Sequence, residues 1–212
     1  MYRGAPAREG LTGDRLRSPP MTAAVLEPPL FLLAMPQVQD PFFRQSVVLL
    51  LAHTEEGSFG FIVNRPTGLK LPEILLGMGI GWQGGPEAEA YLGGPVQPET
   101  GTVLFGEPHV ARIAVEHEVL PGVHLSQHLG DLEALAGEPP ARFRLLLGYA
   151  GWGAGQLEAE IRRNDWLTAP ADPALVFALD PEESWERALA SVGVDPASLP
   201  AWTEPDDGGA AN

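Results

Sequence analysis

The sequence contains no cysteine among its 212 residues. Disulfide bonds, thiol nucleophiles and thiolate metal ligands are therefore excluded, and so is a redox switch built on a thiol. A chain without disulfides suits a reducing compartment, and we expect a cytoplasmic protein. A single domain of this length can bury about 70% of its unfolded surface without covalent cross-links.

Positive charge is scarce as well. Lysine and arginine number 13 against 28 acidic residues, which gives a formal net charge of −15, and Lys70 is the only lysine. Residues 1–21 hold four arginines and two acidic residues, so the rest of the chain is more acidic still. Such a surface repels a phosphate backbone. The composition therefore argues against direct nucleic-acid binding.

Long apolar runs are absent too. Runs such as Leu30–Ala34 and Val47–Ala52 have the length of buried strands, far below the roughly 18 residues of a membrane span. Residues 1–26 show no periodicity and lack the apolar core of about 7 to 15 residues that a signal peptide needs. We expect a disordered extension over 1–26, one domain over 27–202, a polar tail over 203–212, and no membrane partner.

The most informative stretch runs from residue 142 to 166. Its apolar run 143–149, ended by glycine, predicts a buried strand. Leu157 and Ile161 share one face of a helix that we expect from Gly155 to about residue 163. Glycines at 148, 151, 153 and 155 lie between the two elements, which predicts a loop where strand and helix backbones approach closely. On the outer helix face, the spacing predicts the ion pairs Glu158/Arg162 and Glu160/Arg163.

The rest of the chain combines short strands with scattered helices, which indicates an α+β protein rather than regular βαβ winding. Pro72 favours a helix whose core side includes Ile74 and Met78, and Ser126 is placed to cap another. The glycine-rich loop around Trp82 is expected to be mobile. Predicted strands are 30–35, 46–53, 59–64, 91–96, 102–105, 113–120 and 175–179; predicted helices are 71–78, 126–136 and 180–192; a turn is predicted at 65–68 and a loop at 77–89.

Several motifs occur in the order found in one bacterial family. They are Ala34-Met-Pro, Asp40-Pro-Phe-Phe-Arg-Gln-Ser, Gly60-Phe-Ile-Val-Asn-Arg-Pro, Gly93-Gly-Pro-Val, Gly148-Tyr-Ala-Gly-Trp with Gly155-Gln-Leu-Glu, and Asn164-Asp-Trp-Leu. Over about residues 28–202 the chain thus resembles the YqgE/AlgH family. The resemblance implies a single α+β domain whose bifurcated, mainly antiparallel sheet curls into a pseudo-barrel with helices outside. Some members are labelled transcriptional regulators, a role that the acidic charge does not favour.

These motifs fall on turns, where rigid scaffolds often carry their binding residues. We therefore predict a non-enzymatic binding or regulatory module that acts on an unknown protein or small-molecule partner through a groove formed by three turns. For the arginine of the first turn, a fork onto a carboxylate of its own chain competes with one onto a ligand. The predicted groove residues are Asn64, Arg65, Gly93, Gly94, Gly151, Trp152, Gly155 and Gln156.

The main alternative is an enzyme or small-ligand protein that uses Gly151–Gly155 as an anion or nucleotide cradle. A strand, glycine loop and helix can bind phosphate in this way, but the Gly-x-Gly-x-x-Gly spacing is absent. Close packing of strand and helix explains the same glycines, and we favour that interpretation. Likewise, Tyr149, Trp152 and Trp166 could form an exposed aromatic platform, although rings at the ends of elements usually belong to the core.

No catalytic set can be read from the residues. A Gly-x-Ser-x-Gly elbow is absent, so we lean against an enzyme. His124 and His128 are four residues apart with Asp131 beyond them, which could form a metal face on one helix. A cap at Ser126 would instead place the two histidines in different elements, with surface or capping roles. We expect no metal and no cofactor.

Overall fold

The sheet is organised around β9 (Phe143–Gly153). The apolar run 143–149 forms its first part, as predicted. This part pairs antiparallel with β6 (Val96–Phe105) and parallel with β5 (Glu89–Leu92), whereas the last residues of β9 pair antiparallel with β3 (Gly57–Ile62). One strand thus belongs to two branches of the sheet. The computed structural model describes residues 26–107, 113, 118–178 and 180–200.

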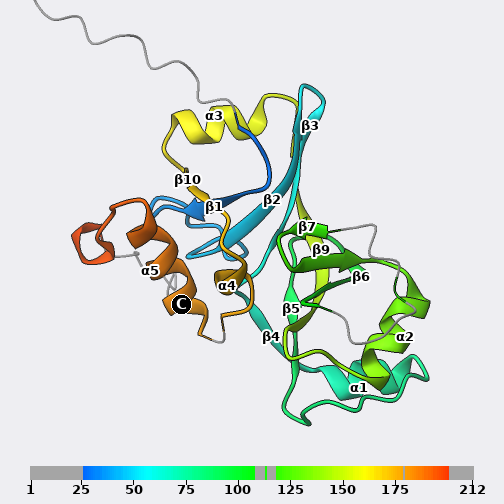
Figure 1. Cartoon of the computed structure of the whole chain (residues 1–212). Coiled ribbons are helices and arrows are strands. Elements are labelled where there is room, and N and C mark those ends of the chain that lie inside the picture. The colour runs from blue at the N-terminus through cyan, green and yellow to red at the C-terminus, as the bar shows by residue number, and fades with distance from the viewer. Residues whose placement is uncertain (1–25, 108–112, 114–117, 179, 201–212) are drawn as a thin grey trace, which may run out of the picture.

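The described strands form one curled sheet, in which β5 and β9 make the only parallel pair. The strand order is β10-β1-β2-β3-β9-β6-β8-β7, and β4 joins β9 through β5. This curled, bifurcated sheet with helices outside confirms the predicted α+β architecture (Figure 1). The remaining strands are β1 (Leu30–Ala34), β2 (Val47–Thr54), β4 (Pro66–Lys70), β7 (Glu118–Leu120), β8 (Val123–Ser126) and β10 (Trp166–Pro170).

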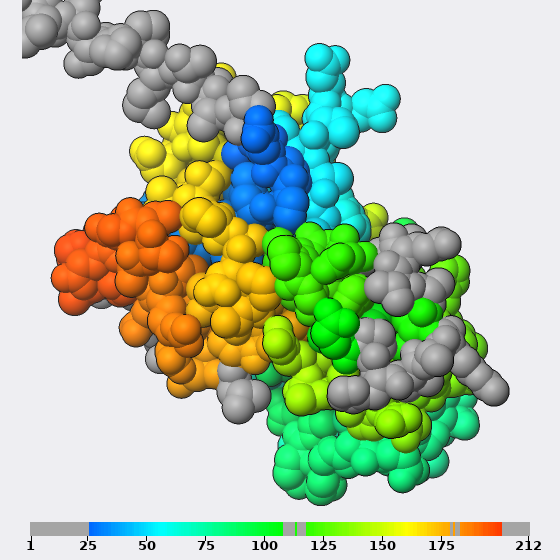
Figure 2. Space-filling model, viewed as in Figure 1, coloured from blue at the N-terminus to red at the C-terminus, as the bar shows by residue number. Residues whose placement is uncertain are grey.

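The helices cover the sheet at separate places (Figure 1). α3 (Gln156–Arg162) lies over the end of β9 and β10, and α5 (Pro181–Ser191) packs against β1, β2 and β10, beside the short α4 (Pro173–Val176). α1 (Leu71–Gly77) and α2 (Leu129–Gly137) lie at the opposite end. A 3-10 turn, η2 (Pro196–Ser198), follows α5. In Figure 2 the green segments form a lobe distinct from the blue, yellow and orange one. None of the described helices is both long and apolar enough to cross a membrane.

Both faces of β1 are buried. Phe31 and Leu33 belong to the apolar cluster that includes α4 and α5, whereas Leu32 and Ala34 belong to the cluster beneath α3. A strand covered on both faces needs apolar residues at every position, not at alternate ones. This is why the sequence shows continuous apolar runs at 30–34 and 47–50, and why the strand predictions there are confirmed.

The prediction of a glycine loop is wrong. Gly151 and Gly153 are strand residues opposite Phe59 and Gly57, and only the turn at 154–155 separates β9 from α3. A close backbone approach does occur, but between strands: a Cβ on Gly94 would lie 2.1 Å from the Tyr149 carbonyl carbon. The glycines of this region therefore let the 93–94 corner pack on β9, and they do not join a strand to a helix.

Two further segments differ in secondary structure from the prediction. Strand pairing determines the structure of the first, and helix capping determines that of the second. Residues 66–70 form β4 instead of a turn, since they pair with β5. Residues 173–176 form α4, where a strand at 175–179 is predicted. Asp172 caps this helix, its Oδ1 accepting from the Ala174 amide at 2.8 Å, and proline at the first helical position is preorganised for it.

Ser126 ends β8 and does not cap a helix as predicted, because α2 begins at Leu129. Its hydroxyl still organises the junction, donating to Asp131 Oδ2 at 2.6 Å and accepting from the His128 amide at 3.1 Å. Of the predicted strand 113–120, only 118–120 is observed as a strand, and 114–117 lie outside the described residues. The predicted extension over 1–26, except residue 26, and the tail over 203–212 lie outside them as well.

Candidate binding cleft

Asn64 fastens the loop between β1 and β2, residues 35–46, to the end of β3. Its Oδ1 accepts from the Val47 amide at 2.8 Å, and its Nδ2 donates to the Gln45 carbonyl at 2.9 Å. The side chain is buried, with 5% of its surface exposed. A carboxamide whose donor and acceptor both bind the backbone fixes a loop conformation. This predicted binding residue therefore has a bracing role.

Arg65 braces the same loop from its outer side. Its guanidinium donates to the Pro41 carbonyl at 2.7 Å and to the Arg44 carbonyl. Burial lowers the pKa of Arg65, and the positive charge of Arg44 lowers it further. The fork therefore engages main-chain oxygens of its own chain, not the carboxylate that the sequence suggested.

Gly93 and Gly94 are enclosed between β3 and β9. The Gly93 amide donates to the Leu147 carbonyl at 2.7 Å, and the Gly93 carbonyl accepts from the Ile62 amide at 2.8 Å. A Cβ on Gly93 would lie 2.3 Å from the Gly148 oxygen. The predicted corner is thus a close backbone contact inside the sheet.

Trp152 is held by Glu160, which the sequence pairs with Arg163. The indole nitrogens of Trp152 and Trp166 each donate to Glu160 Oε2 at 2.8 Å. The two rings meet edge to face with centroids 5.8 Å apart, and both are buried. Arg163 instead binds Asp165 at 2.6 Å. The tryptophans therefore belong to the core rather than to an exposed platform.

The proposed anion cradle is not built at residues 151–155. Gln156 Oε1 accepts from the Gly153 amide at 3.1 Å, and Gln156 Nε2 donates to Glu160 Oε1 at 2.9 Å. Gly155 has φ 71° and leads directly into α3, which has only seven residues. The predicted pair of Glu158 and Arg162 is also different, because Arg162 Nε donates to the Glu158 backbone carbonyl at 3.1 Å.

Phe43 shows where the family motifs converge. Its ring lies 5.5 Å from that of Trp166 and 6.2 Å from that of Trp152, while Asn64 and Arg65 bind the backbone on either side of it. The sequence-predicted residues are therefore partly brought together around loop 35–46. The polar atoms of Asn64 and Arg65 form hydrogen bonds with the backbone, and that of Trp152 with Glu160. These residues therefore form a structural scaffold.

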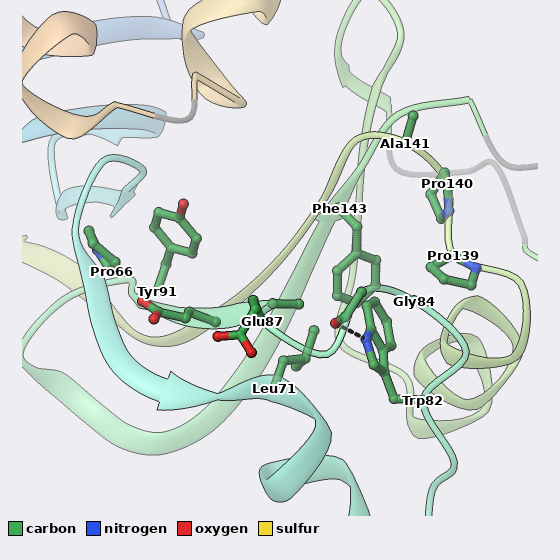
Figure 3. Close-up of a pocket in the computed structure, with 13 residues that line it drawn as sticks. Pro66, Leu71, Trp82, Gly84, Glu87, Tyr91, Pro139, Pro140, Ala141 and Phe143 are labelled. Atoms are coloured by element: carbon green, nitrogen blue, oxygen red, sulfur yellow. Dashed lines mark hydrogen bonds between the residues drawn. The ribbon is translucent and has the colours of Figure 1, made fainter.

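A cleft of about 510 Å³ lies beside this scaffold, between β4–β5, the loop 81–88 and the start of β9. None of the eight predicted binding residues lines it, although Pro66 directly follows Arg65. Trp82 and Phe143 stand together at one end, and Tyr91 and Pro66 at the other (Figure 3). The lining residues are Pro66, Leu71, Trp82, Gly84, Gly85, Glu87, Ala88, Glu89, Tyr91, Pro139, Pro140, Ala141 and Phe143.

The aromatic walls of the cleft are held in place. Trp82 donates its indole N–H to the Gly85 carbonyl at 2.9 Å, and its ring lies 5.2 Å from that of Phe143. At the other end, the Arg144 guanidinium lies 4.1 Å from the centre of the Tyr91 ring. Such cation–π stacking is favourable when the cation is desolvated. The cleft therefore has preformed apolar surfaces.

Arg144, which is not among the predicted site residues, supports the cleft from behind. It is buried and donates to the carbonyls of Val63 and Ala178. Burial lowers its pKa, while the adjacent Tyr91 raises it. Arg144 is the one charged residue within the apolar run 143–147, and this could have indicated its role. A charged side chain is buried in a strand only where hydrogen-bond acceptors surround it.

The cleft carries negative charge. Glu87 and Glu89 line it, and the ammonium of Lys70 lies 3.1 Å from Glu87 Oε2 and 3.0 Å from Glu89 Oε1. Hydrogen bonding to Glu89 and then to Glu87 raises the pKa of Lys70. The Glu87 side chain is 87% exposed, so its charge is available to a ligand. Two carboxylates against one ammonium leave this wall net negative.

The residues that line the cleft are mainly aromatic, proline, glycine and acidic. Among the described residues that line the cleft there is no serine, threonine, histidine or arginine. Both carboxylates accept hydrogen bonds from the ammonium of Lys70. Aromatic rings, prolines and carboxylates are suited to an apolar or cationic ligand.

The histidine prediction is only partly right. His128 precedes α2 at its cap position and is exposed, but its side chain makes no cap hydrogen bond. His124 is buried on β8, with Nε2 3.9 Å from Glu107 Oε1, so the expectation of a surface or capping role is wrong for it. In the part of the chain that the structure describes, no three acidic or histidine side chains gather as a metal site would require.

The curled sheet branching at β9 defines an α+β half-barrel of the AlgH type. The family model described as AlgH-like matches residues 31–197. The chain therefore belongs to the AlgH-like family.

Individual relatives agree with this assignment. A UPF0301 protein of Myxococcus xanthus is 45% identical over 172 residues, covering 81% of this chain and 93% of the relative. A UPF0301 protein of Burkholderia vietnamiensis is 43% identical, covering 80% and 90%. The solution structure of the AlgH protein from Pseudomonas aeruginosa is similar with a TM-score of 0.64 and 40% identity, covering 84% of this chain and 93% of that one.

Proposed function

We propose that this protein is a non-enzymatic binding module whose cleft receives a positively charged, proline-containing segment of a partner protein. The observation that carries the proposal is the combination of aromatic and proline walls with the exposed carboxylate of Glu87. Any regulatory role would then be exerted through this contact. A small cationic ligand would satisfy the same chemistry, and the peptide is favoured because aromatic side chains stand at both ends of the cleft.

Proline-rich segments are recognised by grooves lined with aromatic rings, since their extended conformation is largely formed before binding. Here Trp82 and Phe143 provide one ring pair, and Tyr91 provides a ring at the other end. Between the two ends lies Glu87, which could bind an arginine or lysine of the ligand (Figure 3). Apolar contact and charge recognition would thus act along one segment.

The charge of the whole chain supports a basic partner. A formal net charge of −15 attracts cationic ligands over long range and accelerates their association. The same charge opposes DNA, so the proposal does not include direct action on a promoter. The absence of cysteine supports a cytoplasmic setting for the contact.

Fluorescence anisotropy with a labelled peptide of repeated Pro-Pro-Arg units tests the proposal. We expect saturable binding that weakens when glutamate replaces arginine in the peptide, and again when glycine replaces proline. Replacing Glu87 by Gln should weaken binding several-fold, because it removes a charge that faces the ligand.

The matched control is Glu186→Gln on α5, which makes the same change in net charge at an exposed position away from the cleft. Equal losses in the two variants would mean that only net charge attracts the peptide, and the cleft would then be excluded as the site. Equal binding of the glutamate peptide would exclude the cationic ligand class.

A further inference from the structure

A second hollow, of about 310 Å³, lies between α1 and α2. Ile74 and Met78 form the α1 side, and Leu129 and Leu132 form the α2 side, above a floor that includes Leu145. It shares no lining residue with the aromatic cleft. This α1–α2 groove is therefore a separate surface, and a role for it is independent of the function proposed for the cleft.

The rim of the groove exposes large apolar side chains. Met78 is 52% exposed and Leu129 is 54% exposed, one from each side. The sequence places Met78 on the core side of its helix, and the structure places it at the rim instead. An apolar floor that continues into exposed apolar edges is typical of a surface that is covered by a partner.

The groove floor presents side chains to a ligand, and its backbone hydrogen-bonding groups lie within the sheet. Val103 of β6 and Leu145 of β9 both line it, and they are register partners within the sheet. An extended peptide added here would find the hydrogen-bonding groups of these residues already paired. A helix satisfies its own backbone and needs only apolar contacts spaced at i, i+3 and i+4. The floor therefore favours a helical occupant.

Charge decides what kind of helix fits. Glu99 lines the groove, and Glu133 follows Leu129 by one turn on the same side of α2. No lysine or arginine is among the described residues that line it, and His128 is the sole basic side chain there. Basic residues flanking an apolar stripe would complement this rim. A second copy of the chain, with its own net charge of −15, would be repelled.

We infer that the α1–α2 groove is a docking surface for a basic amphipathic helix of a partner protein. Apolar anchors of that helix lie between Met78 and Leu129, and its lysines or arginines face Glu99 and Glu133. The partner helix needs both its apolar anchors and its basic residues, because the carboxylates of the rim would repel an acidic amphipathic helix. An uncharged apolar ligand would leave those carboxylates unused.

The test uses the full chain and a labelled helical peptide built from Leu and Lys, with a Leu and Glu peptide of the same pattern beside it. Binding is measured by anisotropy at about 0.1 M and about 0.5 M salt, since exposed charges are strongly screened at the higher value. We expect the double variant Met78→Gln/Leu129→Gln to lose about tenfold in affinity at both salt concentrations, because apolar contact is removed without a change in charge.

Leu76→Gln is the matched control. Leu76 is 75% exposed on α1, and it follows Ile74 by two residues, so it projects from the opposite side of the helix. It should bind the peptide like the unmodified chain. Glu99→Gln should weaken binding at the lower salt concentration only. Circular dichroism and thermal unfolding verify that each variant folds.

Three results would overturn the inference. Equal losses in Leu76→Gln and the double variant would show non-specific adsorption on apolar surface. If the Leu and Glu peptide bound as tightly as the Leu and Lys peptide, a basic partner helix would be excluded. Self-association in sedimentation that disappears in Met78→Gln/Leu129→Gln would show that a second copy occupies the groove.

Discussion

The ammonium of Lys70 lies 3.0 Å from Glu89 Oε1, so the only lysine of the chain neutralises part of the acidic wall of the cleft. The same ammonium contacts Glu87 at 3.1 Å. A cationic ligand that approaches these carboxylates must therefore compete with a cation of the protein itself. Lys70 and Glu89 are partly exposed and Glu87 is largely exposed, so water screens these ion pairs and their contribution to stability is small.

We predict that Lys70→Met raises the affinity of the cleft for the Pro-Pro-Arg peptide several-fold, since both carboxylates become available to the ligand. The melting temperature should change little. Arg162→Met is the control, because it removes one positive charge from exposed α3 without touching the cleft. An equal gain in both variants would contradict a local role for Lys70 and leave only the change in net charge.

Glu160 should be essential for stability despite its partial exposure. Truncation to alanine leaves the indole N–H groups of Trp152 and Trp166 without their acceptor in a buried setting. Each unsatisfied donor costs about 1–3 kcal/mol, so for the two donors we expect a loss of about 2–6 kcal/mol in the free energy of unfolding. Urea denaturation followed by tryptophan fluorescence measures it.

Glu158→Ala provides the comparison for Glu160. Glu158 lies on the same helix and is 42% exposed, with Oε1 3.7 Å from His53 Nε2. Its loss should cost less than about 1 kcal/mol, as for other surface pairs. Similar costs for the two substitutions would show that the tryptophan hydrogen bonds contribute no more than an exposed carboxylate does.

A capping sequence predicts a helix when no other pattern in the same segment competes with it. The acidic cap and proline at Asp180-Pro181 predict α5, and Asp180 Oδ1 indeed accepts from the Glu183 amide at 3.1 Å. The same signal at Asp172-Pro173 competes with the apolar run behind it, which predicts a strand, and the cap decides in favour of α4. β4 and β10 are short and become strands through their partners β5 and β1, so periodicity carries little information about them.

The site is harder to predict than the fold. A motif on a turn does not reveal whether its polar atoms face a ligand or its own backbone, and those of Asn64 and Arg65 face the backbone. The cleft walls come from segments around residues 66, 82, 87–91 and 139–143. No spacing within the sequence links these segments. Only the curl of the sheet, which brings β4–β5 beside the start of β9, joins them.

We expect the substitution of Arg144 to affect both the stability of the protein and peptide binding in the cleft. Arg144→Met keeps most of the side-chain volume but leaves the Val63 and Ala178 carbonyls without their donor and the Tyr91 ring without its cation. We expect a loss of about 2–4 kcal/mol in unfolding free energy and weaker peptide binding, because Tyr91 loses its support. Chemical denaturation and the peptide titration measure the two effects.

Arg142→Met is the control for Arg144. Arg142 lies two residues earlier in the chain and is exposed, so its substitution should change the free energy of unfolding by no more than about 0.5 kcal/mol. If both variants were equally stable, the buried hydrogen bonds of Arg144 would have no net effect on folding. Unchanged peptide binding in a destabilised Arg144→Met would separate Tyr91 positioning from core packing.

Gly94 tests the contact that lets the sheet branch. An added Cβ would lie 2.1 Å from both the carbonyl carbon and oxygen of Tyr149 and 2.4 Å from the Ala150 nitrogen, all of which are backbone atoms. Backbone cannot yield as a flexible side chain can, so we expect Gly94→Ala to cost at least about 3 kcal/mol or to prevent folding.

The same substitution at Gly77 should have the opposite sign. Apart from its own helix backbone and its two chain neighbours, no heavy atom lies within 4 Å of the Cβ position there, and Gly77 is a helical residue of α1. Alanine should stabilise the protein by up to about 1 kcal/mol, because it restricts the unfolded chain and favours the helix. Thermal unfolding of both variants, with circular dichroism for any that fails to fold, measures the difference. A Gly94→Ala variant as stable as Gly77→Ala would mean that the 93–94 corner can move away from β9, and that this close contact does not hold the two branches of the sheet together.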